Sequence, residues 1–276
     1  MTMVLAVSAL VGLSIGSFLT VVVSRYGTEE TIVSGRSRCP SCRRILHWFE
    51  LLPALSFIAQ GGRCRSCRAP IPPLYLVIEL ACGFLFIFAA HAVFYSGLRA
   101  PVSLFLDGLW PGSGAVFSFL YFASFLTSAV AVSAYDWLHR LVPRAFLFPP
   151  LFIALAAIGG DSLFRKDPAA LWPPLVAAAL AFGFFWLLWR FSKGQAMGRG
   201  DADVAGLIGL YLGPAQTLFA LLISFWAGAI FGILLVALGK LDWKSQVPFA
   251  PFLFGGALVS LIVGVPDFVA LLFYGF

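Results

Sequence analysis

Long apolar segments recur along the whole chain, and they restrict it to folds that can be built in a membrane. They cover residues 3–23, about 75–94, about 115–134, 146–160, 171–189, 204–239 and 247 to the end. A transmembrane helix needs about 20 predominantly apolar residues. Charged residues make up only 11% of the chain, compared with about 25% in soluble domains. The sequence therefore predicts an all-α, polytopic membrane protein.

The basic residues predict which loops face the cytoplasm. Most lysines and arginines lie in the loops at residues 25–68, 140–144, 190–199 and 240–244, whereas the other loops hold only Arg99, Arg165 and Lys166. Basic loops are typically cytoplasmic, which places the start of the chain outside. The net charge of +6 does not indicate a nucleic-acid partner, because a binding face needs basic and aromatic residues together on a polar surface.

Residues 204–239 have cytoplasmic flanks on both sides in this topology, so the stretch must cross the membrane and return. As one helix it would be roughly 54 Å long, and each crossing needs about 30 Å. Gly213-Pro214 marks a break. Two short spans give about eight transmembrane helices in total, and a single re-entrant segment is the alternative. We divide the chain into a first span (1–24), a cytoplasmic four-cysteine loop (25–73) and a transmembrane core (74–276).

The loop contains two C-x-x-C pairs, Cys39 with Cys42 and Cys64 with Cys67. Two such knuckles supply four thiolates, which is the ligand set of a closed, structural zinc site. We expect the neighbouring Arg38, Arg43, Arg63 and Arg65 to stabilise the thiolates. Two disulfides or a redox pair are the alternative, which the reducing cytosol disfavours. The loop is thus predicted to be a small zinc-binding domain.

Two other residues near this chemistry have simpler explanations. Cys82 lies inside an apolar segment and is expected to be a small core residue. His47 lies between the two cysteine pairs, but four thiolates already complete the shell of a zinc ion.

Two aspartates at span ends are candidate catalytic residues. Asp136 lies at the predicted cytoplasmic end of the third segment, and Asp201 opens the sixth from the same side, within Gly198-Arg199-Gly200-Asp201. Ionisable groups in spans are costly and mark function by default. Two adjacent carboxylates share one proton, so one accepts a proton from water while the other polarises a carbonyl. Gly198 and Gly200 permit close backbone approach.

Each candidate also has a structural explanation. Asp136 could pair with Arg140 one turn away, and Asp201 could cap a helix. Glu79, near the cytoplasmic start of the second span, is a candidate site residue or an ion-pair partner.

Several motifs together resemble the type IV prepilin peptidase family over nearly the full length. They are Gly16-Ser17-Phe18-Leu19 with Arg25, Arg36 through Cys42, Trp48 with Leu52-Pro53, Gly62 through Cys67 with Ala69-Pro70-Ile71, Tyr75 through Glu79, Asp136 with Leu141 and Pro143, Gly198 through Asp201, and Pro248 through Leu253. The combination is specific, although G-x-G-D alone also occurs in presenilin-like proteases.

The resemblance implies a bacterial inner-membrane enzyme with its active site at the cytoplasmic face. Such enzymes cleave the basic leader of type IV prepilins and pseudopilins, and then methylate the new N-terminus with S-adenosylmethionine. Asp136 and Asp201 fall on the family's catalytic aspartates. Expected partners are prepilins, pilus or type II secretion assembly proteins, and anionic membrane lipids that contact the loop arginines. No nucleotide motif locates the methyl-donor site.

The chain departs from the family pattern at three positions. Thr20 replaces a common asparagine, Asp203 replaces a common lysine, and Arg144 replaces a common acidic or amide residue. Asp203 adds a negative charge near Asp201, which would favour protonation of the pair. We therefore expect a higher pH limit for cleavage than in the Asp203→Lys variant.

Two functions of other classes remain as alternatives. An intramembrane proton or ion transporter also needs carboxylates, but it would more often carry them at mid-membrane and show an internal repeat. A scaffold with a zinc loop would explain the cysteines and leave G-x-G-D without a role.

Overall fold

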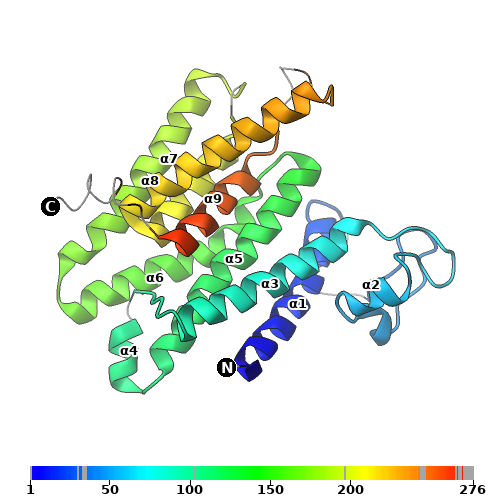
Figure 1. Ribbon diagram of the computed structural model, residues 1–276, viewed down its shortest axis with the longest axis horizontal. Coiled ribbons are helices and arrows are strands. Elements are labelled where there is room, and N and C mark those ends of the chain that lie inside the picture. Colours follow the sequence, from blue (N-terminus) through cyan, green and yellow to red (C-terminus); the bar gives the residue numbers. More distant parts are fainter. Residues whose placement is uncertain are drawn as a thin grey trace. The chain divides into compact units, whose positions relative to one another are not determined.

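The computed structural model describes residues 2–29, 31–32, 36–101, 103–195, 197–240, 242, 247–264, 266 and 269. The described chain is helical (Figure 1). The long helices are α1 (Thr2–Arg25), α3 (Pro73–Phe94), α5 (Ser113–His139), α6 (Phe148–Arg165), α7 (Trp172–Phe191), α8 (Arg199–Ala237) and α9 (Ala250–Val263). The short elements are η1 (Trp48–Leu51), α2 (Leu55–Ala59), α4 (Ser103–Leu109), η2 (Arg144–Phe146) and η3 (Pro168–Leu171). The prediction of an all-α membrane protein is confirmed.

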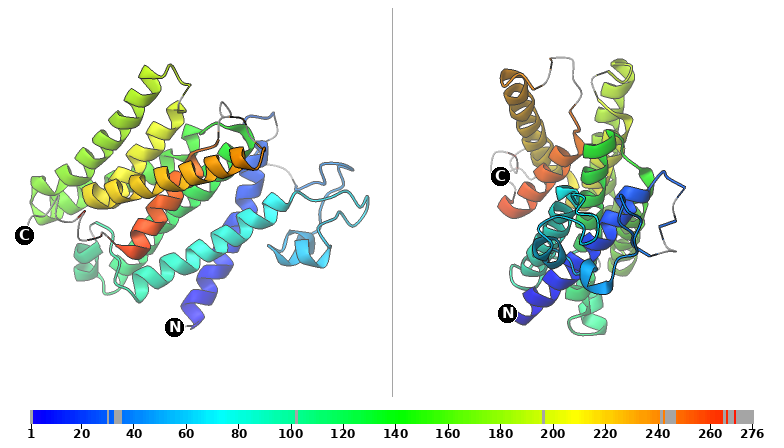
Figure 2. Two further views of the ribbon diagram at one scale, coloured as in Figure 1. Left: turned by 45° about the horizontal axis from the view of Figure 1, so that its top comes forward. Right: turned by 90° about the vertical axis from the view of Figure 1, so that its right-hand side faces the viewer.

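The number of apolar helices in the described residues comes close to the predicted eight once the break in α8 is counted. Six helices of the described chain are long and apolar enough to cross a membrane, and α9 is a shorter apolar helix. Gly213 has φ 71° and ψ −178° inside α8 and precedes Pro214, so α8 consists of two helices. The chain changes direction there (Figure 2). Proline removes a backbone donor and glycine tolerates the positive φ, which explains the break at the predicted position.

Contacts divide the chain into two compact units, which we describe separately. The first comprises residues 1–99 and 118–134, and its core is the packing of α1 against α3. A Cβ on Gly12 or Gly16 would overlap the backbone of Cys82 or Glu79. Small residues at helix contacts let backbones approach closely in membranes. Cys82 is fully buried there, as expected for a core residue.

The second unit comprises residues 100–117 and 135–276. In it, α8 packs against both α7 and α9. A Cβ on Gly209 would overlap the backbone of Ala178 in α7, and one on Gly256 would overlap that of Ala220. The hydroxyl of Tyr211 donates a 3.0 Å hydrogen bond to the carbonyl of Pro150 and joins α8 to α6. The second unit contains Asp136 and Asp201. Most of the last predicted segment beyond Gly264 lies outside the described residues.

Candidate active site and metal site

Asp136 and Asp201 lie at helix ends and are brought together in the second unit. Asp136 is in the last turn of α5, and Asp201 is in the first turn of α8. Their exposed fractions are 5% and 6%. The charge of Asp136 acts on the carboxyl group of Asp201. Two buried carboxylates from distant parts of the sequence therefore form one electrostatic site.

Asp136 receives a hydrogen bond from the start of α9. The backbone N–H of Ala250 donates to Oδ2 of Asp136 over 3.2 Å. The first N–H groups of a helix have no partner within the helix, so they are available to a carboxylate. The sequence motif from Pro248 to Leu253 was noted without a role. Pro248 and Pro251 lack N–H groups, so few backbone donors remain at the start of α9, and that of Ala250 is used by Asp136.

An aromatic cluster holds the start of α9 in this position. Phe249 lies 5.4 Å from the ring centroid of Phe225 and 6.3 Å from that of Phe185. The ring centroids of Phe252 and Phe231 are 5.3 Å apart. These rings come from α7, α8 and the start of α9. The donor to Asp136 is thus fixed by side-chain packing as well as by helix geometry.

Asp201 stabilises the first turn of its own helix. Its Oδ2 accepts a 3.1 Å hydrogen bond from the backbone N–H of Gly198, which is the N-cap of α8. The sequence left open that Asp201 caps a helix. In the structure Gly198 is the N-cap, and Asp201 supports it by accepting its N–H. The other carboxylate oxygen remains available to the site. Capping and catalysis therefore do not exclude one another here.

Two further contacts hold the G-x-G-D segment against its surroundings. A Cβ on Gly200 would overlap the side chain of Val142, in the loop that follows α5. The guanidinium carbon of Arg199 lies 5.7 Å from the ring centroid of Trp189 in α7. Position 200 therefore requires glycine because the backbone there packs closely against Val142, in the loop that follows Asp136.

A third contact near Asp201 is an ion pair between Arg144 and Asp203, two residues that depart from the family pattern. Nε of Arg144 donates to Oδ2 of Asp203 over 2.9 Å. The sequence expectation treated Asp203 as an added negative charge near Asp201. Arg144 offsets that charge, so the structure corrects this premise, and we expect a smaller change in the pH limit of cleavage for Asp203→Lys. The two departures from the family pattern are complementary.

This pairing predicts reciprocal rescue. If the chain is the peptidase that its motifs resemble, Arg144→Asp and Asp203→Lys should each lower kcat/KM for cleavage by about two- to fivefold, the range set by under roughly 1 kcal/mol for a partly exposed pair. The double variant restores the attraction with reversed polarity and should recover most of the rate. Equal losses that add in the double variant would show that the two side chains act separately.

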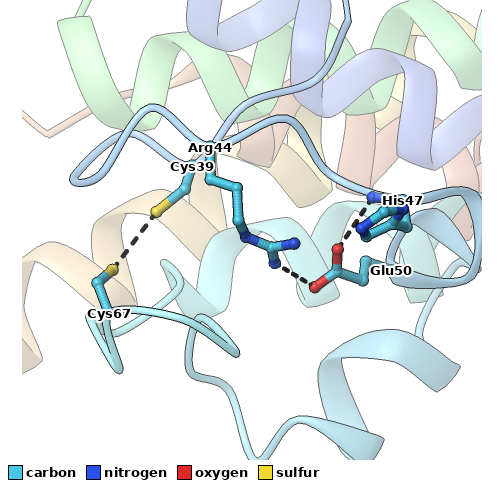
Figure 3. Close-up of polar contacts among 5 residues, drawn as sticks. All are labelled: Cys39, Arg44, His47, Glu50 and Cys67. Carbon is cyan, nitrogen blue, oxygen red and sulfur yellow. Dashed lines mark hydrogen bonds and ion pairs between the residues drawn. The ribbon is translucent and has the colours of Figure 1, made fainter.

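The four loop cysteines form a cluster suited to a metal ion. The Sγ atoms of Cys39, Cys42, Cys64 and Cys67 all lie within 4.8 Å of one another. The Sγ atoms of Cys39 and Cys67 are 3.8 Å apart (Figure 3). Zn–S bonds of about 2.3 Å in a tetrahedron imply a separation of about 3.8 Å. The donor set fits zinc.

Local backbone structure prepares the cluster. Isolated antiparallel bridges, Arg38 with Ile45 and Arg63 with Pro70, close the two knuckles. Backbone N–H groups of Cys67 and Ser66 lower the pKa of the Cys64 thiol. The thiolate is the form that binds a metal, so this knuckle favours the binding form of Cys64.

Arg44 links the two knuckles to η1, a contact that no sequence motif indicates. Its carbonyl accepts from the N–H of Cys39, and its guanidinium lies close enough to Cys64 to interact with it electrostatically. Nη2 of Arg44 lies 2.6 Å from Oε1 of the buried Glu50 (Figure 3). This hydrogen bond lowers the pKa of Glu50, so its contribution to stability is present at neutral pH and lost on acidification. Groups that hold metal ligands in place commonly tune metal affinity.

The remaining predicted residues have structural contacts. His47 donates its backbone N–H to Oε2 of Glu50 over 2.9 Å and stacks on Phe49, outside the cysteine cluster. Glu79 lies in the first unit, where its Oε2 accepts a 2.7 Å hydrogen bond from the N–H of Ala54. Glu79 therefore holds the loop against α3.

Comparisons with known proteins agree with these features. Residues 10–93 match the profile of the bacterial peptidase A24 N-terminal domain, and residues 121–233 match that of the type IV leader peptidase family. A prepilin leader peptidase/N-methyltransferase of Bacillus subtilis is 31% identical and covers 94% of both chains. The Myxococcus xanthus protein of the same name is 32% identical over 85% of this chain and 64% of its own. The Burkholderia pseudomallei protein of that name is 31% identical over 98% of this chain and 88% of its own. No solved structure matches significantly.

Proposed function

We propose, for a chain that belongs to the type IV leader peptidase family, that Asp136 and Asp201 form the catalytic pair of a prepilin peptidase. The observation that carries this proposal is the convergence of both buried carboxylates with the Ala250 N–H. Relatives named prepilin leader peptidase/N-methyltransferase give no support to a transporter.

The proposed reaction is hydrolysis of the peptide bond at the end of the prepilin leader. One carboxylate removes a proton from water, and the water oxygen forms a bond to the scissile carbonyl carbon. The protonated partner donates a hydrogen bond to the carbonyl oxygen. The C–N bond then breaks as the leaving nitrogen takes up a proton. Because the two carboxyl groups titrate as a pair, we assign neither role to one residue.

The second proposed step is methylation of the new N-terminal amine. The name of the relatives includes N-methyltransferase, and S-adenosylmethionine is the methyl donor that this implies. The methyl group passes from the sulfonium to the amine nitrogen, which loses a proton. This step is proposed from the resemblance to the relatives.

The proposed setting is the bacterial inner membrane with the site at the cytoplasmic face. The basic loops that support this orientation include residues 25–68 and 190–199, since basic loops are typically cytoplasmic. The four cysteines are proposed to hold one structural Zn²⁺, with no open position for catalysis. Prepilins, inner-leaflet lipids and pilus or secretion assembly proteins are the proposed partners, and nucleic acid is not one.

A product assay tests both steps in one experiment. The purified full-length chain is incubated in lipid with a prepilin, with and without S-adenosylmethionine, and the pilin is analysed by intact-mass spectrometry. We expect loss of the leader in both reactions and the added mass of one methyl group only with the donor. An uncleaved prepilin, with a known family member active in parallel, would reject the proposal.

A further inference from the structure

The loop segment of residues 48–59, formed by η1 and α2, carries large apolar side chains on its surface. Trp48, Leu55 and Ile58 are 75%, 66% and 67% exposed. Leu51 and Leu52 are also exposed, and no residue of α2 is buried. A surface of this kind is unfavourable in water and marks a contact with an apolar medium or partner.

The position of this apolar segment within the first unit is fixed by Glu79. The N–H of Ala54, just before α2, donates to Oε2 of Glu79. Glu79 lies six residues after the start of α3 at Pro73, which is about 9 Å along the helix axis. The 22 residues of α3 measure about 33 Å, close to the full hydrocarbon thickness of about 30 Å. Figure 1 shows α2 near the end of α3 that joins the loop. If α3 crosses the hydrocarbon core from Pro73, the contact of Ala54 with Glu79 places the start of α2 at the membrane boundary.

The charges around the apolar segment have one sign. Glu50 is the only acid between residues 36 and 72, and it is buried and paired with Arg44. The exposed charged side chains of this part of the loop are Arg36, Arg38, Arg43, Arg63, Arg65 and Arg68. Arg65 lies with its guanidinium carbon 5.4 Å from the ring centroid of Phe49, beside the apolar segment. Clusters of arginines beside a membrane attract anionic lipid head groups.

We propose that residues 48–59 insert into the head-group region of the adjacent leaflet, and that the loop arginines bind its anionic phospholipids. Tryptophan and leucine side chains lie in the interface, as in amphipathic membrane anchors. A basic prepilin leader has the wrong charge for this surface. The four-cysteine loop is then held at the membrane surface and does not extend freely into the cytosol. This inference does not rest on the proposed peptidase activity.

Hydrogen–deuterium exchange of the full-length protein in lipid nanodiscs tests the contact. Nanodiscs of phosphatidylglycerol are compared with nanodiscs of phosphatidylcholine, and exchange is followed in peptides from residues 47–60. We expect exchange to be about fivefold slower in the anionic discs, and this difference to shrink between about 0.05 and 0.5 M salt. Leu55→Ser/Ile58→Ser and Arg63→Gln/Arg68→Gln should each abolish the difference. Arg190→Gln/Lys193→Gln, which removes the same charge elsewhere, should preserve it.

Zinc content shows whether each variant retains a folded loop, and the salt titration of the unaltered protein needs no variant. Equal exchange in both lipids, slow or fast, would overturn the proposed recognition of anionic lipid. Slow exchange that requires added prepilin would assign the surface to the substrate instead. Cleavage activity is not a readout, so failure here is separate from failure of the peptidase proposal.

Discussion

Asp136→Asn and Asp201→Asn should each lower the rate of prepilin cleavage by about 10²–10⁴-fold, the usual contribution of a general acid or base. Asparagine cannot accept or share the proton that the pair needs. It does keep an oxygen that can accept from the N–H of Ala250 or of Gly198, so the local fold should survive. Initial rates with a purified prepilin in lipid, at equal enzyme concentration, measure the effect.

Asp161→Asn is the matched control for this experiment. Asp161 is paired with Arg165 in α6 over 2.8 Å, and the same substitution there should leave the cleavage rate nearly unchanged. Thermal unfolding followed in detergent confirms that all three variants are folded. Cleavage at the unaltered rate by either single-asparagine variant of the pair would reject the catalytic assignment.

Cys67→Ser should reduce bound zinc from about one ion per chain to nearly none. Serine replaces one of four soft thiolate ligands with a hydroxyl. The fifth cysteine, Cys82, lies in α3 outside the cluster and cannot replace it. Elemental analysis of the purified protein measures the loss. Cys82→Ala is the matched control, because Cys82 is buried in α3 and its removal should leave the zinc content unchanged.

Arg44→Gln should weaken zinc binding by about 10–100-fold without removing a ligand. Competition with a coloured chelator measures this affinity.

The two zinc predictions fail separately. Normal zinc content in Cys67→Ser would contradict the four-cysteine site. Normal affinity in Arg44→Gln would contradict only the supporting role of the Arg44–Glu50 pair.

The sequence predicted the fold class well because apolar length is a direct requirement of the membrane. The break at Gly213-Pro214 was also predictable, since both residues have a local backbone effect that does not depend on tertiary contacts. The short helices α2 and α4 were not predicted. Both are shorter than two full turns, and isolated helices of this length have little intrinsic stability. Their formation depends on contacts such as that of Ala54 with Glu79.

The residues of the candidate sites could be predicted from the sequence, but the hydrogen bonds and ion pairs that hold them could not. Asp136, Asp201 and the four cysteines stand out because charges and paired thiols are rare in such a sequence. The donor from Ala250, the Arg144–Asp203 pair and the link from Arg44 to Glu50 join residues by tertiary contact. Position along the chain carries no signal for these contacts, so the charge of Asp203 reads as unpaired in the sequence, although Arg144 pairs with it in the structure.

The hydrogen bond from Ala250 to Asp136 has a consequence for biosynthesis. The ribosome makes Asp136 more than a hundred residues before Ala250, so the carboxylate enters the bilayer without its eventual donor. The site is completed only when α9 has been translated and inserted. A chain that stops before α9 carries both aspartates but lacks this contact, so it tests separately what the aspartates and what their donor contribute.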